Sequence, residues 1–302
     1  MHPQLHQQVV WITGASSGIG AAMARAFSMA GAFVILSARR RQALESVAAS
    51  LPNEAMVLPL DLTDQSAIGP AAEQALAWRG RVDVLVNNAG VSQRSETQHT
   101  KQETARRLME VNFFCATALT AAVLPAMLSK GQGHIVNMTS VAAYVAAPER
   151  AYYSASKHAL RAWSNTLRAE LGGSGVHVTM VCPGFVSTDI SKKALDGEGI
   201  PIGRPDPQVS GGLTAEEVAL QVLPALRGRK REVRIGGVEI MAIYWQRFCP
   251  WIVAWVIPDC VPEADSGMLW GVRGALRAVW GLPAPKRLSR EQAAAQPELI
   301  KR

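Results

Sequence analysis

Short apolar runs alternate along the chain with longer segments whose apolar residues recur at the spacing of an α-helix. Each run is apolar throughout, as expected for strands that are covered on both faces. The runs are Val9–Thr13, Phe33–Ser37, Ala55–Leu60, Val82–Asn87, His134–Asn137 and His177–Cys182. The helical segments are Ile19–Ala30, Gln42–Ala49, Gln65–Trp78, Gln102–Leu128 and Tyr152–Leu171. This alternation predicts an α/β fold with one doubly wound parallel sheet and helices on both of its faces.

The last third of the chain departs from this pattern. A helix at Ala215–Leu226 and a strand at Glu232–Ile235 are expected to complete the sheet, and Leu195–Gly212, rich in Gly and Pro, is predicted as a mobile loop. From residue 241 the alternation gives way to a basic extension that is rich in tryptophan. We therefore divide the chain into a catalytic domain, residues 1–240, and a mainly helical extension, residues 241–302.

A glycine-rich turn at residues 13–20 connects the first predicted strand to the first predicted helix. Glycines there let the backbone approach a pyrophosphate closely, and the helix start supplies free N–H groups and a positive dipole end. Between a strand and a helix, this pattern indicates a dinucleotide site. The predicted contacts are Gly14, Ser16, Ser17, Gly18, Ile19 and Gly20.

The end of the second predicted strand indicates which dinucleotide binds. An acid at this point would accept a hydrogen bond from the ribose 2′-hydroxyl of NAD. Here Arg39 and Arg40 follow the strand, and the first acid is Glu45. Because a guanidinium pairs with phosphate oxygens, the pattern favours NADP(H), with Arg39 as the leading contact. The alternative is that these arginines only begin a surface helix.

The third and fourth predicted strands also end in candidate cofactor contacts. Asp61, followed by Leu62, lies where a carboxylate can accept from an adenine amino group, or where it can cap a turn with Thr63. Small residues at the end of the fourth strand leave room for the cofactor. These are Asn88, Ala89 and Gly90.

Tyr153 and Lys157 are four residues apart in a predicted helix, so they share one face. A free tyrosine, with a pKa of about 10, is a poor acid–base catalyst at neutral pH. A nearby ammonium stabilises the phenolate and lowers that pKa. Tyr152 is the competing tyrosine, but no lysine follows it at the same spacing.

Taken in order, these features resemble the short-chain dehydrogenase/reductase family over residues 8–240. The resemblance rests on Thr-Gly-x-x-x-Gly-x-Gly at 13–20, Asn-Asn-Ala-Gly at 87–90, Asn112, Ser140, Tyr-x-x-x-Lys at 153–157 and Pro183-Gly184 followed by Thr188. It implies a Rossmann-like fold and an NADP(H)-dependent oxidoreductase that moves a hydride between the nicotinamide and a carbonyl or alcohol. Shorter stretches around residues 37–40, 156–160 and 167–170 resemble the branch with steroid, retinoid and lipid carbonyl reductases.

The resemblance also implies a role for each matching residue. Tyr153 exchanges the proton with the substrate oxygen, and Lys157 lowers its pKa and binds the nicotinamide ribose. Ser140 hydrogen-bonds the substrate oxygen, and Asn112 interrupts its helix to hold a water that relays protons to Lys157. The residues expected to border the nicotinamide are Pro183, Gly184, Val186 and Thr188.

A structural membrane-associated protein is one alternative to a reductase of hydrophobic carbonyl compounds, and two further alternatives bind the cofactor. One is a 3-oxoacyl-carrier-protein reductase, against which the C-terminal extension counts. The other is a redox sensor or scaffold that binds NADP(H) without turnover, although all four catalytic positions are filled. In each case we expect a homo-oligomer, either a dimer or a tetramer.

Charge and composition bear mainly on the extension. Of the net charge of +7, residues 227–234 contribute +4, residues 271–302 contribute +5 and the rest of the chain −2. The part that carries the motifs is therefore near neutral, and no nucleic-acid partner is expected. The run Ile240–Ile257 is apolar but is broken by Pro250. It suits a substrate lid, a subunit interface or a peripheral membrane surface carrying Trp251 and Trp255. A membrane-spanning helix is the least favoured alternative, because the run is interrupted.

The N-terminus and the cysteines indicate the compartment. No basic segment followed by an apolar run precedes the first strand, so a cytoplasmic protein is expected, with membrane association through residues 240–280 as an addition. The four scattered cysteines lack metal-type spacing and are expected to be buried free thiols. No metal site is predicted.

Overall fold

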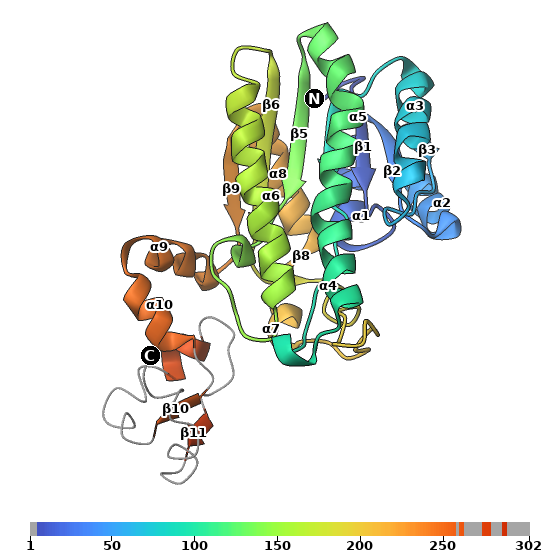
Figure 1. Ribbon diagram of the computed structural model, residues 1–302. Helices are drawn as coiled ribbons and strands as arrows, with labels where there is room; N and C mark the ends of the chain where they lie inside the picture. Colours follow the sequence, from blue (N-terminus) through green and yellow to red (C-terminus); the bar gives the residue numbers. More distant parts are fainter. Residues whose placement is uncertain (1–4, 258–259, 263–273, 279–285, 289–302) are drawn as a thin grey trace.

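The computed structural model describes residues 5–257, 260–262, 274–278 and 286–288. Seven strands of this part form one parallel sheet in the order β3-β2-β1-β4-β5-β6-β9. They are β1 (Val9–Thr13), β2 (Phe33–Ser37), β3 (Ala55–Val57), β4 (Val84–Asn87), β5 (Gly133–Met138), β6 (Val176–Pro183) and β9 (Glu232–Ile235). The order reverses between β1 and β4, and open α/β sheets bind ligands at such a switch point. The predicted α/β fold is therefore confirmed (Figure 1).

Helices cover both faces of the sheet. One face packs against α1 (Gly18–Met29), α2 (Arg41–Ala49) and α8 (Ala215–Arg227). The other packs against α3 (Ile68–Arg79), α5 (Cys115–Lys130) and α6 (Ala151–Glu170), and α4 (Gln102–Met109) contacts α6. In Figure 1, α5 and α6 stand in front of the sheet and α8 lies behind it. This double cover explains why β1, β4 and β5 are buried along their whole length.

Several element boundaries differ from those that the sequence predicts. Pro59 has no N–H to donate, so β3 ends at Val57 instead of Leu60. The single helix predicted over Gln102–Leu128 is divided into α4 and α5 by a π-helical turn at Glu110–Phe114. The predicted loop Leu195–Gly212 contains α7 (Pro207–Ser210), and β8 (Leu213–Thr214) after it pairs with β7 (Val186–Ser187).

The extension lies off the carboxyl end of the sheet, below β9 in Figure 1. It contains α9 (Met241–Phe248), α10 (Pro250–Val256) and a parallel pair of β10 (Cys260–Pro262) and β11 (Lys286–Leu288). Pro250 is tolerated because it begins α10, where its missing N–H costs nothing. Two tryptophans of the extension, Trp270 and Trp280, lie outside the described residues, as does most of the basic segment 271–302.

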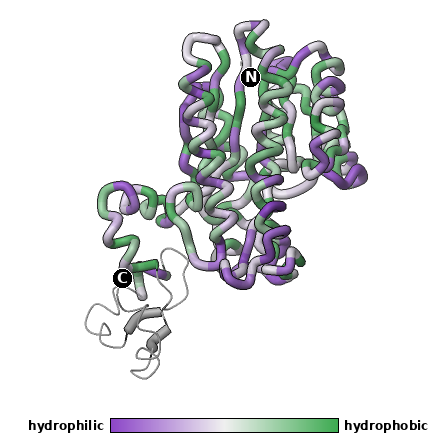
Figure 2. The backbone as a smooth tube through the Cα atoms, in the orientation of Figure 1, coloured by the Kyte–Doolittle hydropathy of each residue, from purple (hydrophilic) through white to green (hydrophobic). Residues whose placement is uncertain are grey.

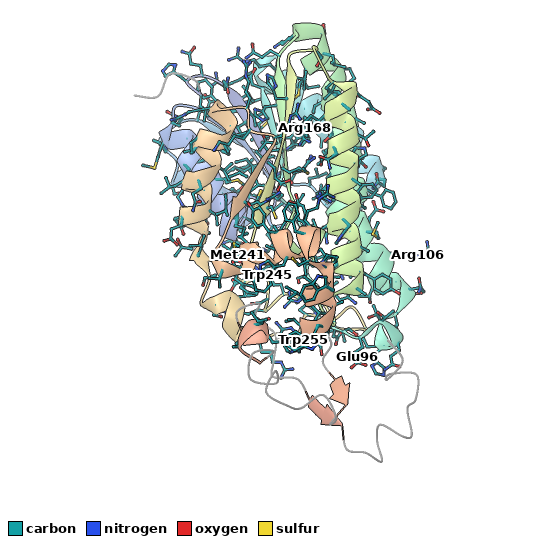
Figure 3. The ribbon with its side chains drawn as sticks, turned by 90° about the vertical axis from the view of Figure 1, so that its left-hand side faces the viewer. Glu96, Arg106, Arg168, Met241, Trp245 and Trp255 are labelled. Atoms are coloured by element: carbon teal, nitrogen blue, oxygen red, sulfur yellow. The ribbon has the colours of Figure 1, made fainter. Side chains whose placement is uncertain are left out.

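A small apolar cluster ties the extension to the catalytic domain. Ala242, Val253 and Val256 of the extension are buried against Val145, and Trp255 packs on the same cluster. Figure 3 shows Trp245 and Trp255 on this part of the molecule. Trp251, in contrast, is 70% exposed. The two tryptophans lie one turn apart on the same side of α10, with Trp251 outermost and Trp255 partly buried, so a membrane surface that carries both stays a prediction.

Gln102–Lys130, which includes α4 and α5, is long and apolar enough to cross a membrane by length and composition alone. Figure 2 shows α5 as mainly hydrophobic. Leu119, Val123 and Met127 of α5 are buried in the apolar core between this helix and the sheet. The stretch therefore makes the contacts of a core helix.

Candidate active site

One cavity of about 690 Å³ opens at the carboxyl ends of the strands. All the residues that the sequence predicts as cofactor contacts line it, as does the predicted catalytic Ser140. The lining contacts are Gly14, Ser16, Ser17, Gly18, Ile19, Gly20, Arg39, Arg40, Asp61, Leu62, Asn88, Ala89, Gly90, Tyr153, Lys157, Pro183, Gly184, Val186 and Thr188. Among the predicted catalytic and cofactor-binding residues, Asn112 is the one that does not line the cavity. The sheet thus gathers residues from most of the catalytic domain into one site.

The glycine-rich turn is fastened to the end of β4. The Thr13 hydroxyl accepts hydrogen bonds from the N–H groups of Asn88 and Ala89, both at 3.1 Å, and the Asn88 amide donates to the Thr13 carbonyl at 2.8 Å. Gly14 has φ +67°, and a Cβ on it would lie 2.8 Å from the Ala89 Cα. Only glycine satisfies both conditions, so this position fixes how closely the two loops approach.

The first turn of α1 presents its N–H groups to the cavity. Its N-cap residue, Ser17, makes no side-chain capping bond, and no acidic side chain lies in the first turn. The N–H groups and the positive end of the helix dipole therefore suit an anion. This is the local chemistry that a pyrophosphate needs, and the cavity wall there is made by Gly18 and Gly20.

Positive charge surrounds the far end of the cavity. Arg39 and Arg40 are exposed and line it, although Arg40 is also the N-cap of α2. Arg40 therefore begins a surface helix and also borders the cavity, and its contact with a 2′-phosphate stays a prediction. Arg107 of α4 lines the same end, and the sequence reasoning missed it because nothing along the chain connects it to residues 39 and 40.

Asp61 closes a local turn at this end. Its Oδ1 accepts from the backbone N–H and the hydroxyl of Thr63, at 2.9 and 2.8 Å. The Thr63 N–H chiefly lowers the pKa of Asp61, and the charges of Arg39 and Arg107 lower it further. The capping role that the sequence left open is therefore present, and the carboxylate still borders the cavity.

Tyr153, Lys157 and Ser140 meet at the other end. Burial raises the pKa of Tyr153, and a hydrogen bond with Ser140 and the charge of Arg150 oppose that rise. Lys157 is 5% exposed, and burial lowers its pKa to about 8. Its Nζ donates to the Met138 carbonyl at 2.9 Å. The site therefore contains a protonated phenol beside a lysine whose charge is easily lost.

Asn112 lies in the π-helical turn and is 1% exposed. Its carboxamide pairs with both backbone groups of Val91, at 2.8 and 2.9 Å, and donates to the Ser156 hydroxyl at 3.0 Å. The predicted interruption of the helix is present. The side chain itself joins the loop after β4 to α6, which carries Tyr153 and Lys157.

The loop after β6 is held by a residue that the sequence reasoning missed. Glu239 is 8% exposed, and its Oε1 accepts from the N–H groups of Phe185 and Gly237, both at 3.0 Å. A Cβ on Gly184 would lie 2.0 Å from that oxygen. Glycine at 184 thus admits the carboxylate, which fixes the wall made by Pro183–Val186. No sequence signal marks a contact that spans 54 residues.

Beyond Tyr153 the cavity wall is mainly apolar. It is made by residues of the loops after β4, β5 and β6 and by two residues of the extension, Ala242 and Ile257. Three charged side chains also line this end: Asp206 forms salt bridges with Arg94 at 2.7 Å and with Arg150 at 3.0 Å. The apolar lining residues are Val91, Val141, Ala142, Val145, Ala146, Ala147, Pro148, Phe185, Ile190, Leu195, Pro201, Val209, Ala242 and Ile257.

Comparison with known proteins decides the family. The model of the family described as short chain dehydrogenase matches residues 8–199, which is more than half of the chain. The chain belongs to the short-chain dehydrogenase/reductase family. Its predicted Rossmann-like fold and the resemblance drawn from its motifs are both confirmed.

Three relatives show how far the similarity extends for this short-chain dehydrogenase/reductase. A dehydrogenase/reductase SDR family protein 7-like from Anopheles gambiae is 38% identical over 271 residues, covering 87% of this chain and 86% of the relative. A short-chain dehydrogenase from Sphingobium yanoikuyae, solved with NADPH, is 31% identical with a TM-score of 0.67, over 75% of this chain and 87% of that one. One from Burkholderia phymatum, solved with NAD, is 25% identical with a TM-score of 0.75, over 82% and 96%.

Proposed function

We propose that this short-chain dehydrogenase/reductase uses NADP(H) to interconvert a carbonyl group and a secondary alcohol on a hydrophobic substrate. One observation carries the proposal: Tyr153, Lys157 and Ser140 share a single cavity with the glycine-rich turn and Arg39. The residues that would hold a dinucleotide therefore border the same space as the phenol. The same four predicted positions, Asn112, Ser140, Tyr153 and Lys157, are the proposed catalytic set.

The chain's own residues handle the proton and the developing charge. A bound nicotinamide supplies the hydride in reduction and accepts it in oxidation. In reduction, Tyr153 donates its phenolic proton to the substrate oxygen, and the Ser140 hydroxyl stabilises the negative charge that develops there. Lys157 stabilises the resulting phenolate. Burial keeps the phenol protonated at neutral pH in the free protein, which suits an acid for reduction.

The preference for NADP(H) rests on the charges around the far end of the cavity. Arg39, Arg40 and Arg107 line it. A 2′-phosphate carries roughly two negative charges near neutral pH, so these guanidiniums bind it better than they bind a ribose hydroxyl. Asp61 also lines this end, and its Oδ1 accepts a hydrogen bond from Thr63. We propose that the carboxylate of Asp61 borders the adenine.

The substrate class follows from the wall beyond Tyr153. Apolar side chains dominate it, and burial of apolar surface contributes about 25 cal/mol per Å². We propose that residues 241–257 serve as the lid on this end, because Ala242 and Ile257 line the cavity while the α9–α10 cluster packs on Val145. A carbonyl compound with a large apolar body therefore fits better than a small polar one.

The outer face of the extension suits a membrane surface. Tyr244, Phe248 and Trp251 are 41%, 74% and 70% exposed. Arg247 is exposed beside them, and Arg234 of β9 lies over the Tyr244 ring. The other basic residues of segment 227–234 precede β9, at the amino end of the sheet. Aromatic residues insert at the headgroup level, and each nearby basic residue adds about 1 kcal/mol on anionic lipid. We propose reversible, peripheral binding through this face, so that an apolar substrate enters from the lipid side.

The assembly is proposed separately from the reaction. Phe114 and Leu128 of the long α4–α5 stretch are 48% and 42% exposed, and a contact with a second copy would cover them. We propose a homo-oligomer of two or four chains. Light scattering on the purified protein tests it, and a monomer at every concentration overturns it.

The function is tested by incubating the purified chain with a panel of aldehydes and ketones and with NADPH or NADH. The panel runs from short polar compounds to long-chain and polycyclic ones and includes an acyl-carrier-protein ketoester. Oxidation of NADPH with the apolar members supports the proposal. Selective use of the carrier-protein ester identifies a 3-oxoacyl-carrier-protein reductase instead. Tight cofactor binding with no turnover identifies a nucleotide-binding sensor.

A further inference from the structure

Helix α6 carries Tyr153 and Lys157 but has no side-chain cap of its own. Its N-cap residue, Arg150, makes no capping bond, and the preceding Glu149 has φ +62°, in the left-handed region. The first N–H groups of a helix have no partner inside the helix. A nearby Ser, Thr, Asp or Asn usually accepts from the second or third helical residue. In α6 these are Tyr152 and Tyr153.

Gln93 performs this capping from 60 residues away in the chain. Its Oε1 accepts from the N–H of Tyr152 at 3.0 Å and from the N–H of Tyr153 at 3.3 Å. Gln93 is 0% exposed. One buried oxygen therefore serves the two N–H groups that an ordinary N-cap serves, and one of them belongs to the proposed acid–base residue itself.

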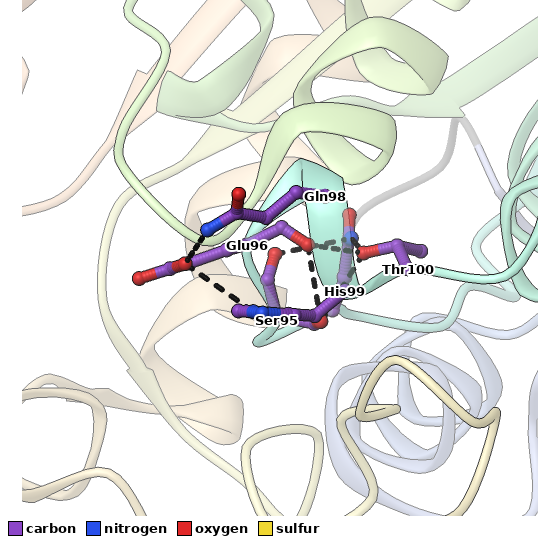
Figure 4. Close-up of polar contacts among 6 residues, drawn as sticks. Ser95, Glu96, Gln98, His99 and Thr100 are labelled. Atoms are coloured by element: carbon purple, nitrogen blue, oxygen red, sulfur yellow. Dashed lines mark hydrogen bonds and ion pairs between the residues drawn. The ribbon is translucent and has the colours of Figure 1, made fainter.

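The Gln93 side chain is itself fixed in one orientation. Its Nε2 donates to the Thr100 hydroxyl at 3.0 Å, and that hydroxyl donates to the Glu96 carbonyl at 2.8 Å. Figure 4 shows this turn, with Thr100 hydrogen-bonded within Ser95–Thr100. With its amide nitrogen facing Thr100, the amide oxygen of Gln93 faces α6.

The backbone around Gln93 is also held. The Leu195 N–H donates to the Ser92 carbonyl and the Arg94 N–H donates to the Leu195 carbonyl, both at 2.9 Å. Leu195, Ser92 and Arg94 all line the cavity. Gln93 thus joins the start of α6 to a segment that is anchored on both sides.

We propose that Gln93 is a positioning residue that holds the first turn of α6, and with it the Tyr153 hydroxyl, against Ser140. The inference rests on the proposed function of Tyr153. A shift of the Tyr153 backbone moves the phenol directly, because the capped N–H and the side chain belong to one residue. A misplacement of about 1 Å is enough to cost on the order of 10²-fold in rate.

Two variants separate positioning from folding. Gln93→Met keeps the size of the side chain and removes the accepting oxygen. Gln93→Glu restores an accepting oxygen, and the Thr100 hydroxyl can turn its proton toward it. Gln98→Met is the matched control, because Gln98 is exposed on the same turn and pairs with Glu96.

For Gln93→Met we expect kcat, calculated per NADPH-binding site, to fall by about 10-fold to 10²-fold. The Kd for NADPH should stay within about twofold of that of the parent. Gln93→Glu should recover most of kcat. Its added negative charge disfavours the phenolate, so its pH–rate profile should move to higher pH. The Gln98→Met control should match the parent.

A loss of activity in Gln93→Met that equals the loss of folded, NADPH-binding protein would overturn the proposal, because it indicates a structural role alone. If Gln93→Met does not fold, an unshifted pH profile in Gln93→Glu overturns it. If the parent shows no turnover, the proposed function fails, but the inference about Gln93 can still be tested by NMR. The chain has four tyrosines, so the ring carbon signal of Tyr153 can be resolved and followed. A Tyr153 signal that titrates identically in the parent and Gln93→Glu then overturns the inference.

Discussion

The Lys157 ammonium lies 6.0 Å from the centre of the Tyr153 ring, one helical turn along α6. Its Nζ donates to the Met138 carbonyl. The charge that opposes the raised pKa of Tyr153 is that of Arg150, so a lowering of that pKa by Lys157 stays a prediction. The proposed acid–base residue, Tyr153, therefore lies beside a buried lysine whose pKa is lowered.

That buried charge makes stability depend on pH. Lys157 has a pKa of about 8 in the folded protein and 10.5 without perturbation. Below pH 8 it is charged in both states, so the full cost of burial, about 3 kcal/mol from the size of the shift, is present. Above pH 8 the folded state loses the proton first, and the cost disappears as the pH approaches 10.5.

We therefore expect the cofactor-free parent to gain stability relative to Lys157→Met by up to about 3 kcal/mol between pH 7 and 10.5. Urea denaturation of both proteins across this range measures the difference. Titration of Tyr153 is shared by both proteins and largely cancels. A difference in unfolding free energy that stays constant with pH contradicts the lowered pKa of Lys157.

Cofactor choice tests the arginines. Arg39→Asp should lower kcat/KM for NADPH by roughly 10-fold to 10²-fold, the loss expected for a charge-assisted hydrogen bond, and should favour NADH in relative terms. Arg41→Asp is the control, because Arg41 begins α2, pairs with Glu45 and does not line the cavity. Equal kcat/KM for the two cofactors in the parent counts against Arg39 as a phosphate contact.

Membrane binding tests the outer face of the extension. The full chain should pellet with anionic vesicles at low salt and be released by high salt, since surface charge is screened. Replacing both Phe248 and Trp251 with Ser should weaken pelleting. Leu220→Ser, at an apolar position 63% exposed on α8, is the control. A parent chain that stays in solution with anionic vesicles at low salt removes the membrane proposal.

Local pattern was enough to predict the sheet. Largely apolar runs mark β1, β2, β4, β5 and β6, because these inner strands are covered on both faces. The edge strands β3 and β9 are only partly buried, and β9 still lies where the sequence predicts it. The motif residues could likewise be located, because each follows the end of a strand or lies one helical turn from its partner. The errors at Leu60 and within Gln102–Leu128 arise where a proline or a π-turn interrupts an otherwise regular pattern.

Contacts between distant segments could not be predicted in this way. Gln93 reaches α6 across 60 residues, and Glu239 reaches Phe185 across 54. The local sequence around a glutamine or glutamate in a polar loop does not show whether its side chain faces solvent or caps a buried turn. Trp255 and Trp251 are alike in sequence, and only the packing of α10 on Val145 separates them.

The most direct test of the account is turnover by Tyr153→Phe, which removes one hydroxyl and leaves the ring. With a carbonyl substrate from the panel and NADPH, the variant should lose about 10²-fold to 10⁴-fold in kcat, while its Kd for NADPH stays near that of the parent. Tyr152→Phe is the matched control, and its turnover should stay close to that of the parent. Turnover by Tyr153→Phe within a few-fold of the parent would contradict the assignment of Tyr153 as the acid–base residue.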